Sequence, residues 1–173
     1  PGPHPPFDPT PEIAEKYMAR DCPLPNVSHE ELADLVSPWV AKRHHDVEVD
    51  HDSVAWKLNP TKDELHRMRA YYYANVEMID NQVGNILNSL KERGNMDNTI
   101  VIFTSDHGDN LGDHGLIQKW APYEEVTRVP LIISAPKRFK SGKTINSMVQ
   151  LFDLAPTILE WSGVKPNPTF EAI

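Results

Sequence analysis

Residues 99–119 read TIVIFTSDHGDNLGDHGLIQK, an apolar run followed by a polar loop. Its first part is an apolar, β-branched run, which predicts a short buried strand over 99–104. The run stops at Ser-Asp-His-Gly, and a second Asp-His-Gly follows before Lys119. Ligands of α/β sheets gather beyond the carboxyl ends of the strands. The polar loop after this strand is therefore the first place to look for a site.

The segments on either side of the strand complete an α/β pattern. Apolar residues at steps of three and four predict one long helix over 62–93, with Thr61 and Glu64 as a capping box and Gly94 as its stop. Downstream, PLIIS predicts a second strand over 130–134, residues 144–150 a further short strand, and 153–161 a closing helix. We expect an α/β fold, a sheet with flanking helices, in which the 65–90 face of the long helix packs on the sheet.

Residues 1–60 have an irregular, proline-punctuated pattern. A short helix is predicted within 12–20, and Ser28 is predicted to cap another, with Glu31 as its capping-box partner. The polar, histidine-rich segment 41–60 is interpreted as a surface insertion. Its histidines show no repeated ligand spacing, and we interpret them as solvated loop residues: His44, His45 and His51.

Composition excludes several classes of function. The net charge is −8 and no basic cluster exceeds Lys-Arg, which argues against a nucleic-acid partner. The apolar runs are far shorter than a bilayer requires, so no membrane partner is expected. The single cysteine, Cys22, excludes a disulfide within this chain. The chain begins at Pro-Gly-Pro without an apolar leader, so we expect a trimmed or truncated product and leave its compartment open.

The loop after the first strand has the composition of a metal site. Asp106 and His107 can both ligate one divalent cation if the backbone bends, and Gly108 permits a bend. Alone, such a pair is typical of a turn cap and a surface histidine. Further acids and imidazoles follow at Asp109, Asp113 and His114. A loop this rich in acids is costly to order without a counter-charge, which favours a bound cation.

The chemistry of the ligands narrows the choice of cation. Carboxylate oxygens favour Ca²⁺ or Mg²⁺, and an added imidazole shifts the preference toward Mn²⁺ or Zn²⁺. Lys119 adds a point charge suited to binding a tetrahedral oxyanion or protonating its leaving group.

Three segments occur in an order known from one enzyme family. They are YYYANVEMIDNQVGNILNSLKERGNMDNTIVIFTSDHGDNLGDHGLIQK over 71–119, YEEVTRVPLIISAP over 123–136, and QLFDLAPTILEWSGV over 150–164. Together they closely resemble the sulfatase family of the alkaline phosphatase superfamily. The phrase TSDHG and the spacing from Asp106 to Lys119 resemble most the branch of phosphonate monoester hydrolases and choline-sulfatase-like enzymes.

The resemblance implies a role for each matching residue. Asp106 and His107 match metal ligands, with Ca²⁺ or Mn²⁺ the expected cation. Lys119 matches the lysine that binds the transferred sulfate or phosphate oxygens, and His4 resembles the histidine that contacts the leaving-group oxygen. The remaining loop residues match positions that shape the loop: Asp109, Asp113 and His114.

The family's nucleophile has no counterpart here. It is a formylglycine made from the Cys of Cys-x-Pro-x-Arg, whereas Cys22 stands in RDCPLPN, without the arginine and after the His4 segment. We interpret Cys22 as an ordinary loop thiol. The resemblance implies the C-terminal part of a catalytic domain, with 1–60 a substrate-side segment, 61–164 the α/β core and 165–173 a tail. Its expected partners are the missing N-terminal half and a small-molecule sulfate or phosphonate ester.

Three functions stay open. The first is a fragment of a metal-dependent sulfuric ester hydrolase whose formylglycine lies outside this chain. The second is a phosphonate monoester or phosphodiester hydrolase of the same superfamily, and the third is a catalytically silent structural or binding fragment.

Overall fold

The computed structural model describes residues 3–34, 37–49 and 57–170. It forms two compact units, Pro1–Lys137 and Arg138–Ile173, which are described separately. Within the described ranges, every helix is too short or too polar to span a membrane.

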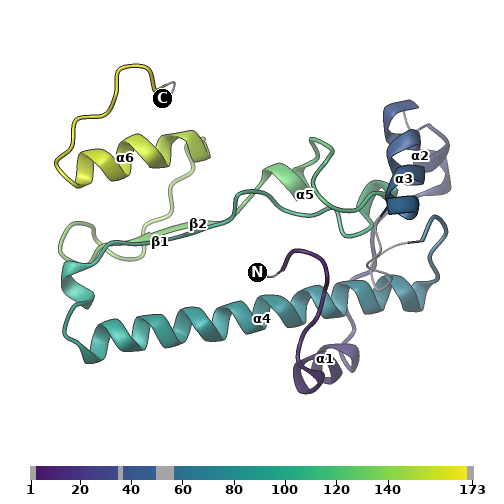
Figure 1. Cartoon of the computed structure of the whole chain (residues 1–173), viewed down its shortest axis with the longest axis horizontal. Helices are drawn as coiled ribbons and strands as arrows, with labels where there is room; N and C mark the ends of the chain where they lie inside the picture. Colours follow the sequence, from purple (N-terminus) through teal and green to yellow (C-terminus); the bar gives the residue numbers. More distant parts are fainter. Residues whose placement is uncertain (1–2, 35–36, 50–56, 171–173) are drawn as a thin grey trace. The chain divides into compact units, whose positions relative to one another are not determined.

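The long helix α4 (Lys62–Glu92) organises the first unit (Figure 1). The Thr61 hydroxyl accepts a hydrogen bond from the Glu64 backbone N–H at 3.2 Å, and the Glu64 carboxylate accepts one from the Thr61 N–H at 2.9 Å. Gly94 follows the last turn with φ +66°, a left-handed conformation that glycine adopts without steric cost. The predicted helix, its capping box and its stop are confirmed.

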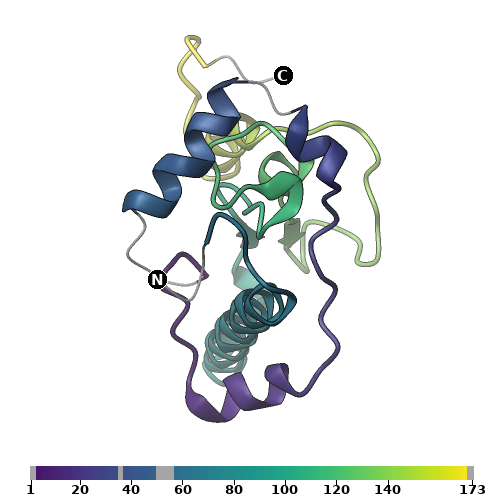
Figure 2. The ribbon, with the colours of Figure 1, turned by 90° about the vertical axis from the view of Figure 1, so that its right-hand side faces the viewer.

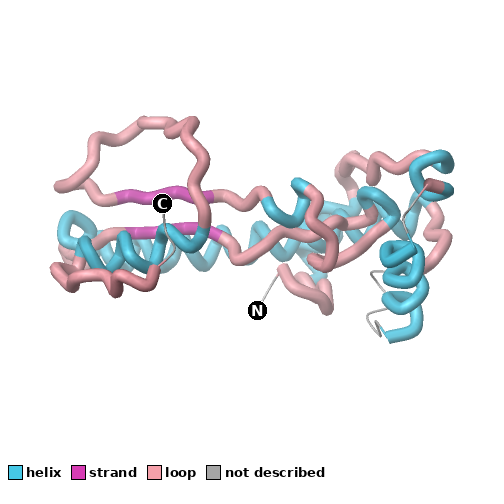
Figure 3. The backbone as a smooth tube through the Cα atoms, turned by 90° about the horizontal axis from the view of Figure 1, so that it is seen from above, coloured by secondary structure: helices cyan, strands magenta, loops and turns pink. Residues whose placement is uncertain are grey.

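The two strands form a small antiparallel sheet, seen side by side in Figure 3. A short turn of 3₁₀ helix, η1 (Met96–Asn98), leads from α4 into β1 (Val101–Thr104). This strand pairs with β2 (Leu131–Ser134), and Thr104 lies opposite Leu131. Both predicted strands are confirmed. The polar loop follows directly after the carboxyl end of β1.

The N-terminal segment is more helical than its sequence indicated. Helix α1 (Pro11–Met18) packs against α4, which Figure 2 shows nearly end-on. Helix α2 (His29–Ala33) is capped by Ser28, and α3 (Ser37–Val49) occupies part of the segment expected to be a loop insertion. His44 and His45 are exposed, as expected, but they lie on a helix; His51 lies outside the described residues. No proline or glycine interrupts 39–49, so the polar run is free to form a helix.

The core lies where the first turns of α4 meet the N-terminal segment and the polar loop. Its buried centre is Phe7, Met68 and Ile117. The expectation that the whole 65–90 face packs on the sheet is wrong, because α1 is the main partner of α4 and Ile86 is 62 % exposed. Periodicity reveals an apolar stripe on a helix but does not identify what covers it.

This arrangement predicts a contrast between the two ends of the helix. Met68→Ala is expected to lower the free energy of unfolding by about 2–5 kcal/mol, because a buried side chain is replaced by a cavity. Ile86→Ala, on the exposed end, should change it by less than about 0.5 kcal/mol. Urea denaturation measures both, and equal losses would contradict the placement of the core.

In the second unit, α6 (Leu154–Trp161) is the main element. It follows a 3₁₀ turn, η3 (Leu151–Asp153), and ends at Gly163 with φ +76°, as the sequence predicted. The strand predicted over 144–150 is wrong, since this segment is irregular in the structure. Its apolar residues are exposed: Ile145, Met148 and Val149. A β-branched run forms a strand only where another strand pairs with it.

Candidate active site

The loop between β1 and α5 (Glu124–Thr127) holds its side chains through an unusual backbone. Several of its residues adopt left-handed φ angles: Leu111, Gly112, His114, Gly115 and Gln118. Cross-loop bonds fix this path, with the Gly112 N–H donating to the Leu116 carbonyl at 2.9 Å and the Asp113 N–H to the Asn110 carbonyl at 2.8 Å. The loop is therefore irregular in secondary structure but closely hydrogen-bonded.

Gly108 is required for close approach. Its N–H donates to the Val126 carbonyl at 2.8 Å, and a Cβ at this position would lie 1.9 Å from the carbonyl oxygen of Glu125. No larger residue fits between the loop and α5 without moving the backbone. The sequence indicated a bend here, whereas the structure gives a steric reason for the glycine.

Asp106 and His107 present their side chains together just beyond the carboxyl end of β1. The Asp106 carboxylate is 85 % exposed and accepts the His107 N–H at 2.9 Å, and its other oxygen lies 3.6 Å from His107 Nε2. His107 Nδ1 lies 2.7 Å from the Gly108 carbonyl, which requires Nδ1 to be the protonated nitrogen. In the neutral tautomer that this contact selects, the lone pair is on Nε2, on the side of the carboxylate.

The ionisation of Asp106 also suits a metal ligand, because a carboxylate binds cations in its charged form. Burial works to raise the pKa of Asp106, but the His107 backbone N–H, the His107 ring and Lys119 together hold it below its ordinary value. Within the described parts of the chain, no cluster of three or more potential metal-ligating side chains is found.

Lys119 and His4 meet although 115 positions separate them in the sequence. His4 Nδ1 lies 2.6 Å from the Pro5 carbonyl, which places the proton on Nδ1. His4 Nε2 then accepts a hydrogen bond from Lys119 Nζ at 3.2 Å. This contact brings the N-terminal segment to the polar loop.

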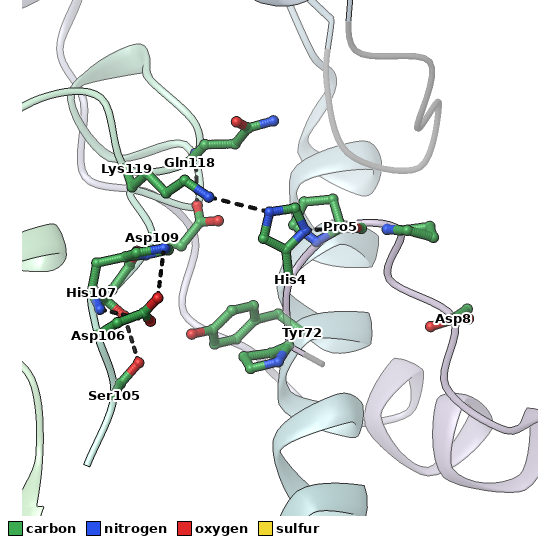
Figure 4. A pocket seen from close by; sticks show the side chains of 13 residues that line it. His4, Pro5, Asp8, Tyr72, Ser105, Asp106, His107, Asp109, Gln118 and Lys119 are labelled. Carbon is green, nitrogen blue, oxygen red and sulfur yellow. Dashed lines mark hydrogen bonds and ion pairs between the residues drawn. The ribbon is translucent and has the colours of Figure 1, made fainter. Parts of the chain in front are cut away.

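All four predicted residues line one cavity of about 590 Å³, between the loop and the His4 segment (Figure 4). The sequence did not single out several other lining residues: Asp8, Tyr72, Ser105 and Gln118. Tyr72 belongs to the apolar stripe of α4 and has the pattern of a core residue. Asp8 and Gln118 follow no pattern beyond being close in sequence to His4 and Lys119.

Asp109 holds the loop together from inside. One of its oxygens accepts the N–H groups of Leu111 and Gln118, each at 2.9 Å. Burial raises the pKa of Asp109 even though these two bonds oppose the rise. This carboxylate fixes the backbone just before Lys119.

Asp113 anchors the other side of the loop. It lies 2.6 Å from the guanidinium of Arg69, a buried residue of α4, and it also accepts the Asn26 N–H at 2.8 Å. The partner of a buried guanidinium is strongly structural, because removing it leaves an uncompensated charge. Both oxygens of Asp113 are therefore engaged by other residues of the protein, which gives Asp113 a structural role.

His114 joins three segments. Its Nδ1 lies 2.5 Å from Glu31 of α2, its Nε2 lies 3.3 Å from Glu125 of α5, and its ring stacks on Tyr123 at 3.7 Å between centroids. Burial lowers the pKa of His114, but the two carboxylates outweigh it and raise the pKa above the ordinary value. An imidazole between two carboxylates is best satisfied when doubly protonated.

The raised pKa of His114 predicts a pH-dependent stability. Because the folded pKa lies above the unfolded one, the extra stability is complete below about pH 6.5 and is lost as pH rises through the folded pKa. Wild type should therefore exceed His114→Gln in unfolding free energy at about pH 5.5, and the difference should shrink by about pH 9. Urea titrations at both pH values measure it. A difference independent of pH would show that the stabilising contacts of His114 do not depend on its charge.

Cys22 is buried, and its Sγ lies 3.7 Å from the Tyr17 carbonyl. Burial raises the pKa of the thiol, so the nucleophilic thiolate is disfavoured. Cys22 is not among the residues that line the cavity.

Comparison with known proteins relates this chain to one family. A family model described as Sulfatase matches residues 1–164. An arylsulfatase of Clostridium perfringens is 34 % identical over 99 % of this chain and 34 % of its own length. An N-acetylglucosamine-6-O-sulfatase of Bacteroides thetaiotaomicron is 45 % identical over 54 % of this chain and 17 % of its own. The chain thus spans about a third or less of these relatives.

Superposition on solved structures identifies the fold. The phosphonate monoester hydrolase of Silicibacter pomeroyi superposes with a TM-score of 0.76 at 27 % identity, covering 88 % of this chain and 30 % of that protein. The phosphonate monoester hydrolase of Agrobacterium radiobacter gives 0.74 at 27 % identity, covering 95 % and 34 %. The fold is that of an alkaline-phosphatase-like hydrolase domain, and the chain belongs to the sulfatase family.

Proposed function

We propose that this chain is the C-terminal part of the catalytic domain of a metal-dependent sulfuric ester hydrolase. The observation that carries the proposal is the cavity that brings His4 to Lys119, beside Asp106 and His107. An ammonium group, an imidazole and a metal-ligating pair around one cavity form a set suited to an ester of a tetrahedral oxyanion. The relatives named as sulfatases support the sulfate ester.

Asp106 and His107 would supply half of the site for a divalent cation. The donor set fits, because an exposed carboxylate oxygen and the unprotonated Nε2 face each other, and the Gly108 carbonyl fixes the imidazole tautomer. Ca²⁺ and Mn²⁺ suit this mixed donor set best. A bound cation would stabilise negative charge on the ester oxygens.

Lys119 and His4 would act on the leaving group. With its Nδ1–H directed to the Pro5 carbonyl, His4 offers Nε2 to the cavity, where it shares a proton of the Lys119 ammonium. An ester oxygen seated beside Lys119 Nζ would receive a charge-assisted hydrogen bond as the bond to it breaks. Lys119 and His4 would therefore stabilise the departing oxyanion, whereas the nucleophile would displace it.

The nucleophile would come from outside this chain, as a formylglycine of the family's type. The hydroxyl of Ser105 lines the cavity but donates to the His107 carbonyl at 2.6 Å, which makes it a structural hydroxyl. The buried Cys22 thiol does not line the cavity. Neither group is placed as an activated nucleophile.

Hydrolysis of phosphonate monoesters is the second candidate. It is favoured by the superposition on two phosphonate monoester hydrolases, the branch that the phrase TSDHG resembles. Sulfate and phosphonate monoesters both present a tetrahedral group with charged oxygens, so the same cavity suits either.

Turnover assays separate these possibilities. We expect the full-length protein to hydrolyse 4-nitrophenyl sulfate. We expect this chain alone to show only background turnover, since no activated nucleophile is found among its described residues. A higher kcat/KM for a phenylphosphonate ester would favour the second candidate. Turnover by this chain alone, abolished by Lys119→Ala, would overturn the proposal that the nucleophile lies elsewhere.

A further inference from the structure

The side chain of Lys119 leaves the backbone next to a peptide group that other residues hold in place. The carbonyl of Gln118 and the backbone N–H of Lys119 belong to one planar peptide group, so the direction of this carbonyl constrains the path of the chain into Lys119. Gln118 adopts a left-handed φ of +58°, a conformation that residues other than glycine keep only where their surroundings hold it. The position of the Lys119 ammonium therefore depends on the contacts that the Gln118 backbone makes.

Asn110 supplies two of these contacts. Its backbone N–H donates to the Gln118 carbonyl at 3.0 Å, and its side-chain Nδ2 donates to the same oxygen at 2.8 Å. The Gln118 N–H in turn donates to Asp109 at 2.9 Å (Figure 4). Both polar groups of the Gln118 backbone are thus bonded to residues of the same loop, and the Asn110 side chain makes the shorter of the two bonds to the carbonyl.

The side chain of Asn110 is costly to bury. It is 0 % exposed, yet its Oδ1 has no hydrogen-bond partner among the described residues. A buried acceptor without a partner destabilises a fold, and an apolar side chain in its place would avoid that cost. Packing therefore does not explain an amide at this position, whereas the bond from Nδ2 to the Gln118 carbonyl does.

We propose that Asn110 is a positioning residue for the reaction, whose side-chain amide fixes the Gln118 carbonyl and thereby orients the Lys119 ammonium toward the departing oxygen. Asn110 does not line the cavity, so it acts through Lys119 and not on the substrate. The inference rests on the proposed function and adds to it the residue that presents the lysine.

The test is a double-mutant cycle in the full-length enzyme with 4-nitrophenyl sulfate, using Asn110→Ala, Lys119→Ala and the double variant. Asn110→Ala keeps the backbone bond to Gln118 and removes only the one from Nδ2. It should lower kcat/KM by about 5- to 30-fold, because a small displacement of a group that acts on the transition state is costly. In the Lys119→Ala enzyme the same substitution should lower kcat/KM by less than about 2-fold, since the ammonium that it would displace is absent. Equal losses in the two backgrounds would overturn the inference.

A second variant and a matched control separate this effect from damage to the fold. Asn110→Leu keeps the branched shape without a donor, and it should reproduce the loss even if Asn110→Ala does not fold. Asn75→Ala is the matched control, because Asn75 is also buried, its Nδ2 has no partner among the described residues, and it does not line the cavity. It should leave kcat/KM within about 2-fold of wild type, and a loss equal to that of Asn110→Ala would overturn the inference. Thermal melting shows which variants are folded. Failure of both Asn110 variants to fold would also overturn it, since the amide would then serve the fold itself.

The outcomes also separate the inference from the function on which it rests. Wild-type turnover of the sulfate ester with equal losses in the two backgrounds would overturn the inference and preserve the proposed function. Turnover of a phenylphosphonate ester alone would contradict the sulfate ester, and the same cycle on that substrate would then decide the role of Asn110. Absence of wild-type turnover of either ester would overturn both.

Discussion

Lys119→Ala in the full-length enzyme is expected to lower kcat/KM for 4-nitrophenyl sulfate by about 10²- to 10³-fold, the usual effect of losing one donor to a developing oxyanion. Lys119 Nζ lies on the cavity wall, held 3.2 Å from His4 Nε2. Its backbone is fixed by the bonds that Asp109 makes just upstream, so the ammonium is positioned before substrate binds.

A second measurement distinguishes the proposed role from simple electrostatic attraction. If Lys119 stabilises the departing oxygen, the loss should grow with the basicity of the leaving group and be larger for an alkyl sulfate than for the nitrophenyl ester. Lys137→Ala is a suitable control, since this exposed lysine lies 3.9 Å from Asp97 and does not line the cavity. An unchanged kcat/KM for Lys119→Ala would remove Lys119 from the reaction.

Local patterns in the sequence were sufficient for the main helix and both strands. The capping box of Thr61 and Glu64, the stop at Gly94 and the β-branched run after 99 each depend on neighbours within a few residues. The meeting of His4 with Lys119 is different. No local pattern indicates it, and it was expected only because the chain resembles a family in which the two residues share a site.

The errors have a common physical origin in long-range packing. The stripe over 65–90 is apolar, yet α1 and Phe7 cover only its first part, and Ile86 stays exposed. Residues 144–150 have the composition of a strand but no strand beside them in the described structure. Tertiary partners decide such segments, and periodicity alone does not reveal them.

The helical pattern of α4 does not reveal the surroundings of two of its residues. Arg69 sits among apolar neighbours and has the pattern of a surface charge, yet it is buried and paired with Asp113 at 2.6 Å. Tyr72 continues the apolar stripe but lines the cavity. The chemical context of each residue is created by the loop, which lies far away in the sequence.

Asp106→Ala in the full-length enzyme is expected to remove both the bound divalent cation and turnover, because the substitution deletes an exposed carboxylate that faces His107 Nε2. The matched control is Asp113→Asn. It changes an acid of the same loop whose oxygens are engaged by Arg69 and Asn26, so the cation should stay in place. Asparagine keeps one of the two acceptor oxygens but not the charge that compensates Arg69, so thermal melting must show that this variant is folded.

Elemental analysis of these proteins tests the assignment of the metal ligands most directly. We predict about one equivalent of divalent metal in wild type and in Asp113→Asn, and well below one in Asp106→Ala. A stoichiometric amount of metal retained by folded Asp106→Ala would show that the cation is held elsewhere and would contradict the site described here.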